Sequence, residues 1–249
     1  MVAVGSRWTR EDLIRHYGLP EQKVQVVATA PLIEAFDNLT AEEIVRVGEG
    51  LGLPGEFLLY PAQTWPHKNR LGLLEALRVL RERSGLAPPL VCTGYRNDFY
   101  PSIAKRVREL GLERQVVFPG VVSRRELVCL YRACRAVVIP TRFEAVSFPL
   151  WEAFAAGVPA ACSRVTSLPE QAGDAALLFD LDDVEAMAEA ILRLWTDGEL
   201  RRELAERGRR RAAYSWERTA RLFRAHYRRL AGSRLVQEDE QLLAAPAPV

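Results

Sequence analysis

Residues 136–162 read AVVIPTRFEAVSFPLWEAFAAGVPAAC, and the order of patterns within them indicates the fold. Two short apolar runs, AVVIPT and VPAAC, stand on either side of a helical pattern over Pro149–Ala156 that Gly157 ends. A strand, a helix and a second strand in this order form a parallel βαβ unit. Because the strands are apolar on both faces, we expect helices to cover both sides of the sheet.

The same alternation of patterns runs through most of the chain. Further strands are expected in FLLYPA (57–62), PLVCTG (89–94), QVVFPG (115–120) and residues 177–180, and helices over residues 69–84, 100–110, 124–134, 184–195, 199–213 and 216–230. The sequence therefore predicts an α/β fold, a Rossmann-like parallel sheet with helices on both faces and additional C-terminal helices. Ligands of such a sheet bind beyond the carboxyl ends of its strands.

The two ends of the chain differ from this pattern. Residues 8–17 predict a helix and residues 23–27 a strand, joined through PLIEAFDN (31–38) to the region before Phe57. We interpret residues 1–50 as the edge of an N-terminal domain with a linker, and residues 51–232 as the main, ligand-binding domain. Residues 233–249 are acidic and then rich in Ala and Pro, which predicts a frayed tail.

The composition is that of a globular protein. Of the 249 residues, 49% are hydrophobic and 27% are charged, which argues against a disordered, collagen-like or disulfide-scaffold chain. The longest apolar runs fall far short of the ~20 residues that span a bilayer. The first residues, MVAVGSRWTREDL, lack the apolar run of a secretory signal, so we expect a cytoplasmic location.

The charge is balanced overall but uneven along the chain. The net charge is +2, so the molecule as a whole does not attract nucleic acid. Residues 197–234 hold 12 Arg and 5 acidic residues, a balance of +7 that leaves −5 elsewhere. Two interpretations stay open for this basic segment: a solvated face of amphipathic helices, or peripheral contact with an anionic surface such as the inner membrane face or with a charged acceptor.

The four cysteines and three histidines do not form a metal-binding or disulfide pattern. Cys92, Cys129, Cys134 and Cys162 have no C-x-x-C spacing, and most lie in apolar runs, which predicts buried free thiols. The histidines are scattered. The motifs G-x-x-x-x-G-K-[ST], G-x-S-x-G and H-E-x-x-H are absent from the sequence, which weakens the P-loop, hydrolase and zinc-protease hypotheses.

Two glutamates flank the junction between the strand AVVIPT and the helix that follows it. Glu144 lies in the loop, and Glu152 is expected in the first turn of the helix. A carboxylate can accept hydrogen bonds from two adjacent sugar hydroxyls. The backbone N–H groups around Ser147, Phe148 and Leu150 and the helix dipole suit a phosphate. The alternative is that a first-turn Glu complements the helix dipole and a loop Glu is solvated.

A lysine follows the strand FLLYPA within YPAQTWPHKN (60–69). Lys68 stands just before a helix on the expected rim of the sheet, where it could neutralise the negative charge of a diphosphate leaving group. The alternative is an exposed lysine in solvent. We expect His67 to be a polar loop residue.

These segments resemble the C-terminal half of a GT-B glycosyltransferase of the retaining family 4. The resemblance covers residues 55–230 and rests on FLLYPAQTWPHKN, TGYRND, YRACRAVVIPTRFEAVSFPLWEAFAAGVP, SLPEQAGDAALLFD and YSWERTARLF. It implies that this domain binds a nucleotide-sugar donor. The roles it implies are contact of Glu144 with the transferred sugar, of Glu152 with the ribose, of Lys68 with the diphosphate, of the backbone at Ser147 and Phe148 with phosphate and sugar, and of the backbone near Val122 with the base.

The resemblance also implies the reaction. Members transfer a hexosyl-type sugar to an acceptor hydroxyl, here an unknown sugar or lipid-linked acceptor, with retention of configuration and without a metal or other cofactor. An N-terminal domain holds the acceptor, and the helix after Trp216 resembles the segment that crosses back to it, so we expect the isolated chain to lack one wall of the active site. The alternatives are a non-catalytic nucleotide-sugar binding fragment, and a sugar epimerase or phosphorylase on the same fold.

The chain departs from the family pattern in two places. Where members usually have E-G-F-G-L-P, this chain has EAVSFP, so Ala145 and Ser147 replace two glycines. Where many members have a phosphate-binding arginine, this chain has Ala62. The resemblance therefore does not define the sugar, and it leaves Lys68 as the cation of this segment.

Overall fold

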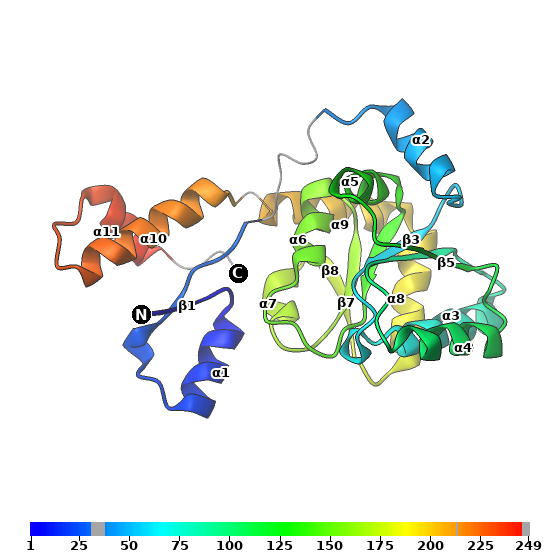
Figure 1. Cartoon of the computed structure of the whole chain (residues 1–249), viewed down its shortest axis with the longest axis horizontal. Coiled ribbons are helices and arrows are strands. Elements are labelled where there is room, and N and C mark those ends of the chain that lie inside the picture. Colours follow the sequence, from blue (N-terminus) through cyan, green and yellow to red (C-terminus); the bar gives the residue numbers. More distant parts are fainter. Residues whose placement is uncertain (31–37, 213, 246–249) are drawn as a thin grey trace.

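The computed structural model describes residues 1–30, 38–212 and 214–245 of the chain (Figure 1). Its main feature is a six-stranded parallel sheet with the strand order β5-β4-β3-β6-β7-β8. The strands are β3 (Leu58–Pro61), β4 (Leu90–Thr93), β5 (Val116–Gly120), β6 (Ala136–Ile139), β7 (Ala160–Ser163) and β8 (Ala176–Phe179). The predicted Rossmann-like α/β fold is confirmed.

Helices cover both faces of this sheet, as the two-sided apolar strands predict. On one face α3 (Arg70–Ser84) contacts α4 (Tyr100–Glu109) and α8 (Val184–Thr196). On the other face α6 (Phe148–Ala156) contacts α5 (Arg124–Ala133), α7 (Leu168–Ala172) and α9 (Gly198–Arg211). A Cβ on Gly208 would lie 2.7 Å from Phe154 Cδ1, so only glycine lets α9 pass so close to α6.

The core lies between the sheet and these helices. The side chains of β3, β4, β6 and β7 are buried throughout, including those of Leu58, Val91 and Val137. Truncation of a fully buried aromatic such as Phe154 to Ala would cost about 3–5 kcal/mol. The core therefore fixes the positions of the loops that leave the strand ends.

The two ends of the chain meet in a second group of elements. A short βαβ unit, β1 (Val2–Val4), α1 (Arg7–Tyr17) and β2 (Val24–Val26), has two parallel strands, with the short 3-10 helix η1 (Glu21–Lys23) before β2. The C-terminal helices α10 (Trp216–Leu230) and α11 (Gln237–Ala244) lie beside it, away from the six-stranded sheet (Figure 1). Thr219 Oγ1 of α10 donates to Ala28 O at 2.9 Å, which joins the two ends.

Three α-helices were not predicted from the sequence: the five-residue α7, α2 (Ala41–Gly50) and α11. α2 lies within the segment interpreted as a linker, and it packs on α5. α11 lies within the predicted tail, because the acidic residues there pair with arginines of α10. Asp239 is fully buried and accepts from Arg228 at 2.7 Å, and Glu238 accepts from Arg221 at 2.8 Å. The predictions made for residues 31–37, 213 and 246–249 lie outside the described residues.

Two further expectations concern cysteines and membranes. All four cysteines are buried and free, as predicted, and burial raises the pKa of the Cys162 thiol to about 12. Within residues 1–30, 38–212 and 214–245, no helix combines the length and apolar character needed to cross a bilayer.

Candidate functional site

The strand order of the main sheet reverses between β3 and β6. The chain adds β4 and β5 on one side of β3, then crosses back to place β6, β7 and β8 on the other side. The loops that follow β3 and β6 leave in opposite directions around this point, and ligands of open α/β sheets bind in the resulting crevice. Lys68 follows β3 and Glu144 follows β6, so the topology brings the two predicted residues to one place.

Lys68 and Glu144 form an ion pair across this crevice. Lys68 Nζ lies 2.5 Å from Glu144 Oε1, although the residues are 76 positions apart. The side chains are only 18% and 12% exposed, so water screens the pair less than it screens a surface pair. The alternative of two separately solvated side chains is therefore wrong.

Backbone contacts hold Lys68 in place. It ends the short 3-10 helix η3 (Pro66–Lys68), and its carbonyl accepts from the buried Tyr60 hydroxyl at 2.8 Å. The carbonyl of His67 accepts from Arg142 N at 2.7 Å and from Thr141 Oγ1 at 3.1 Å. Burial lowers the pKa of the His67 side chain. His67 thus ties the two loops together through its backbone.

The backbone of Glu144 is held on both sides by the segment after β7. Thr166 Oγ1 accepts from Glu144 N at 3.1 Å and donates to Glu144 O at 2.8 Å, and Ser167 Oγ donates to the same oxygen at 2.9 Å. Thr166 adopts φ +47°, which is strained for a β-branched residue. The strained residue is thus the one that fixes the Glu144 backbone.

Arg70 is a buried cation behind Lys68 that sequence reasoning missed. It is 2% exposed, and its guanidinium donates to the carbonyls of Ala62, Gln63 and Thr93. A Cβ on Gly94 would lie 2.1 Å from Ala62 O, so the backbones of the β3 and β4 loops touch here. The sequence feature that could have pointed to Arg70 is its position two residues after Lys68, in PHKNR.

Glu152 lies in the second turn of α6, which begins at Phe148, and not in the first turn as predicted. Its Oε2 accepts from the hydroxyl of the buried Tyr131 of α5 at 2.7 Å. Burial raises the pKa of Glu152, while the bond from Tyr131 and the charge of Arg124 oppose this shift. Tyr131 is a second residue that sequence reasoning missed, because it lies on the apolar face of α5, which predicts a core residue.

The first turn of α6 differs from the prediction at Ser147. The Ser147 N–H donates to Gln171 Oε1 at 2.8 Å, and the residue is fully buried, so this N–H is not one of the unpaired donors. The first helical bond runs from Trp151 N to Ser147 O. The N–H of Phe148, a residue 45% exposed, has no acceptor within the helix and remains suited to an anion, whereas Leu150 is fully buried like Ser147.

Val122 lies further along the same edge of the sheet. It lies in the loop after β5, which is an edge strand of the sheet, and immediately precedes Ser123, the N-cap of α5. Its side chain is partly buried against the core. The structure thus brings Lys68 and Glu144 into contact and places Glu152 and Phe148 on the next helix, with Val122 two strands from Lys68.

The start of α1 contacts the loop that carries Glu144. The Trp8 and Phe143 rings meet edge to face at 5.6 Å, and Thr9 Oγ1 donates to Ala145 O at 3.3 Å. A Cβ on Gly5 would lie 2.4 Å from Val146 Cγ2, which requires glycine at that position. Sequence reasoning missed these contacts because they join segments over a hundred residues apart.

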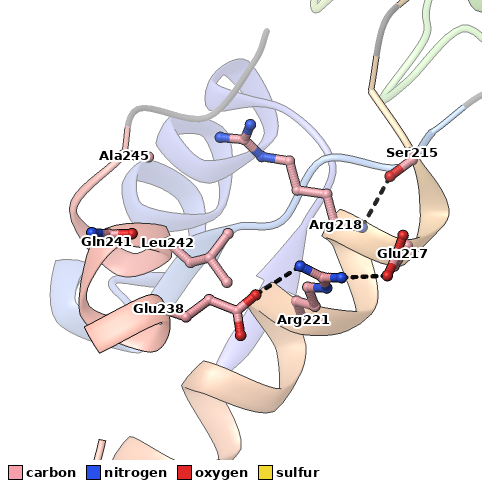
Figure 2. Close-up of a pocket in the computed structure, with 8 residues that line it drawn as sticks. All are labelled: Ser215, Glu217, Arg218, Arg221, Glu238, Gln241, Leu242 and Ala245. Atoms are coloured by element: carbon pink, nitrogen blue, oxygen red, sulfur yellow. Dashed lines mark hydrogen bonds and ion pairs between the residues drawn. The ribbon is translucent and has the colours of Figure 1, made fainter. Parts of the chain in front are cut away.

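Two hollows are lined by residues of α10, α11 and the β1–β2 unit rather than by Lys68, Glu144 or Glu152. One of about 430 Å³ is lined by Arg218, Arg221 and Glu238 among others (Figure 2), and the second, of about 340 Å³, lies beside it. In the first, Arg221 already pairs with Glu217 and Glu238. We therefore place the candidate site at the crevice, where the charges of separate loops converge at the strand ends.

The crevice combines one cation, two carboxylates and a helix N-terminus, which suits a ligand with phosphate groups and several hydroxyls. Among the described residues, no group of three or more His, Cys, Asp or Glu side chains could hold a metal ion. The family Glycosyl transferases group 1 matches residues 42–211. The chain belongs to this family, and the fold corresponds to the C-terminal domain of its GT-B members.

Individual relatives agree with this assignment. The O-antigen chain mannosyltransferase B of Escherichia coli is 32% identical over 219 residues, which are 87% of this chain and 57% of that protein. The crystal structure of a glycosyltransferase from Rickettsia africae has a TM-score of 0.84 at 19% identity, over 94% of this chain and 64% of that one. Anabaena HepE in complex with UDP and glucose has a TM-score of 0.75 at 18% identity, over 86% and 58%. This chain thus spans little more than half of the curated relative.

Proposed function

We propose that this chain is the donor-binding domain of a retaining glycosyltransferase that moves a hexosyl unit from a nucleoside diphosphate to an acceptor hydroxyl. The observation that carries the proposal is the Lys68–Glu144 pair at the reversal of strand order. An ammonium for the diphosphate and a carboxylate for the sugar stand side by side where the fold binds its ligands. HepE forms a complex with UDP and glucose, and the E. coli relative is a mannosyltransferase, which supports this substrate class.

Each residue has a role in the proposal. Lys68 binds the diphosphate, and the pair with Glu144 opens as it does so, because the diphosphate carries more negative charge than one carboxylate. Glu144, once released, accepts from hydroxyls of the sugar. Glu152 accepts from the two ribose hydroxyls, the N–H of Phe148 binds phosphate, and the backbone near Val122 meets the base.

Catalysis in this proposal is electrostatic. As the bond from the sugar to the diphosphate breaks, negative charge grows on the leaving oxygen. Lys68 and the N-terminus of α6 are already positioned to stabilise that charge, so they need no reorganisation during the reaction. The proposal assigns charge neutralisation to the chain's own groups and needs no metal or other cofactor.

An acceptor-binding half completes the active site in this proposal. α10 exposes a stripe of apolar side chains at helical spacing, with Trp216 40%, Tyr227 60% and Leu230 61% exposed. We propose that this stripe and the β1–β2 unit belong to the acceptor-binding half, whose bulk corresponds to the part of the mannosyltransferase that this chain does not match. The same exposed stripe favours a second candidate function for this chain by itself, since without the rest of the acceptor-binding half the chain would bind the donor but transfer no sugar.

A ligand screen tests the proposal. Thermal unfolding is measured with UDP, GDP, ADP and their sugars, since a ligand of the folded state stabilises by RT ln(1 + [L]/Kd), about 2.7 kcal/mol at one hundred times Kd. Stabilisation by one of these diphosphates or its sugar supports donor binding, and stabilisation by none contradicts it. Transfer and donor hydrolysis are then assayed, and binding without turnover selects the second candidate for this chain.

A further inference from the structure

The hydroxyl of Tyr131 lies between α5 and α6, where it meets the helix that carries Glu152. Its ring is fully buried, and its Oη lies 2.7 Å from Glu152 Oε2 and 3.4 Å from Pro149 O. The hydroxyl therefore has one acceptor in the first turn of α6 and a second acceptor in the next turn. A phenylalanine would fill the same volume, so packing alone does not require this oxygen.

The surroundings of Glu152 are otherwise unfavourable for a charged carboxylate. Burial raises its pKa, and the bond from Tyr131 opposes this more than the charge of Arg124 does. Both opposing groups lie on α5. Of the other helices packed on α6, α9 places Arg209 against Gly157 at the far end of α6, and α7 directs Glu170 toward α1. Tyr131 is thus the main contact that favours the ionised carboxylate.

We infer that Tyr131 is a positioning residue for nucleotide binding, whose hydroxyl fixes the orientation and the charge of the Glu152 carboxylate. The inference rests on the proposed function, in which Glu152 accepts from two ribose hydroxyls. An ionised carboxylate has acceptor sites on both oxygens, so Tyr131 can hold Oε2 while Oε1 and the remaining lone pair face the ligand. A protonated carboxyl would present a donor to the ribose and lose one of these bonds.

The test combines substitution with a pH series. The tightest-binding of UDP, GDP and ADP is titrated calorimetrically into the wild type, Tyr131→Phe, Glu152→Gln and the double variant between pH 5 and pH 8. At pH 7 we expect Tyr131→Phe to weaken binding about tenfold, as for a lost hydrogen bond to a charged group. Its affinity should recover as the pH rises, because its Glu152 ionises at a higher pH.

Two controls separate the hydroxyl's role from packing and from other titrations. The Glu152→Gln series records the pH dependence that the ligand phosphates and the Lys68–Glu144 pair contribute. In that background Tyr131→Phe should change the Kd less than about twofold, because its partner carboxylate is absent. If Tyr131→Phe does not fold, Arg124→Gln at the exposed start of α5 replaces it as the test. This variant should also move the loss of affinity at low pH to higher pH, but by less.

The outcomes are distinguishable. The inference is supported if, relative to the Glu152→Gln series, the loss of affinity at low pH moves to higher pH in Tyr131→Phe, and if Tyr131→Phe leaves the pH dependence unchanged in the Glu152→Gln background. An equal loss at every pH and in both backgrounds, or an unchanged Kd while Glu152→Gln weakens binding, contradicts the inference and leaves the proposed function standing. A wild type that binds none of the diphosphates contradicts the proposed function itself.

Discussion

The loop that carries Glu144 and the helix that carries Glu152 offer two carboxylates on one rim in opposite surroundings. Glu144 pairs with the ammonium of Lys68 at 2.5 Å, and its backbone is fixed by Thr166 on a neighbouring loop. Glu152 accepts from the neutral hydroxyl of Tyr131 and forms no ion pair with any described residue. One carboxylate is held by a charge that a competing anion can remove, whereas the other is held by a neutral partner.

This difference separates binding from transfer. A diphosphate that takes Lys68 frees Glu144, so in our proposal Glu144 engages the sugar only after the donor has bound. Glu152 is in place before the ligand arrives. We therefore expect the Glu144 loop to govern turnover and the Glu152 helix to govern affinity.

The largest effect is expected from Glu144→Gln. Loss of a charged contact to the reacting sugar should lower turnover about 100-fold, while the Kd of the donor changes less than about threefold. Transfer is measured with the acceptor-binding half present, and donor affinity by calorimetry. A Kd that rises as much as turnover falls would mean that Glu144 is a binding residue like Glu152.

Glu152→Ala should weaken nucleoside diphosphate binding about 10- to 50-fold, because two hydrogen bonds to a charged acceptor are lost. Calorimetry gives the Kd, and turnover at saturating donor should change little. The matched control is Glu189→Ala, since Glu189 is an exposed glutamate on α8. Equal affinity of Glu152→Ala and the control would remove the ribose assignment.

Lys68→Met tests the ion pair in the absence of ligand. The variant leaves Glu144 largely buried without its partner, which should cost about 1–2 kcal/mol of unfolding free energy in denaturant titrations. Lys105→Met is the control, because its pair with Glu109 is exposed, at 73% and 40%, and should cost less than about 0.5 kcal/mol. Equal losses would show that the Lys68 pair behaves as a surface pair.

Trp8→Ala should act on the loop but not on the helix. Its ring packs on Phe143, next to Glu144, so its removal should lower turnover about threefold through looser positioning of that loop. The Kd of the nucleoside diphosphate should stay within error of the wild type. A weaker Kd with unchanged turnover would reverse the division between loop and helix.

The smallest effect is on stability without ligand. Because burial raises the pKa of Glu152, its charged form penalises the folded state once the pH exceeds the ordinary carboxyl pKa. Glu152→Gln should therefore be as stable as the wild type near pH 4 and more stable at pH 7, measured by denaturant unfolding. The exposed Glu189→Gln should show no such trend. A difference that is constant from pH 4 to pH 8 would exclude this charge penalty.

The main sheet could be predicted from the sequence because its signal is local. Each strand is an apolar run and each helix has a periodic stripe, so their alternation alone indicates a parallel sheet and the rim where ligands bind. The places of Lys68 and Glu144 followed from the same argument, since each lies in the loop that follows a strand.

The missed features depend on partners distant in sequence. The acidic residues of α11 predicted a tail because their partners, Arg221 and Arg228, lie on another helix. The Ser147 N–H was predicted to face a phosphate, but it donates instead to the side chain of Gln171, 24 residues away. α2 did carry a local signal: Thr40 and Glu43 have the spacing of a capping box, and Thr40 accepts from Glu43 N at 3.2 Å.

Hydrogen–deuterium exchange with and without the tightest-binding nucleoside diphosphate locates the ligand directly. We expect slower exchange in residues 62–70 and 141–153, which follow β3 and β6, and unchanged exchange in α10 and α11. Slower exchange confined to residues 215–245, around the hollow of Figure 2, with residues 62–70 and 141–153 unchanged, would contradict the placement of the site at Lys68, Glu144 and Glu152.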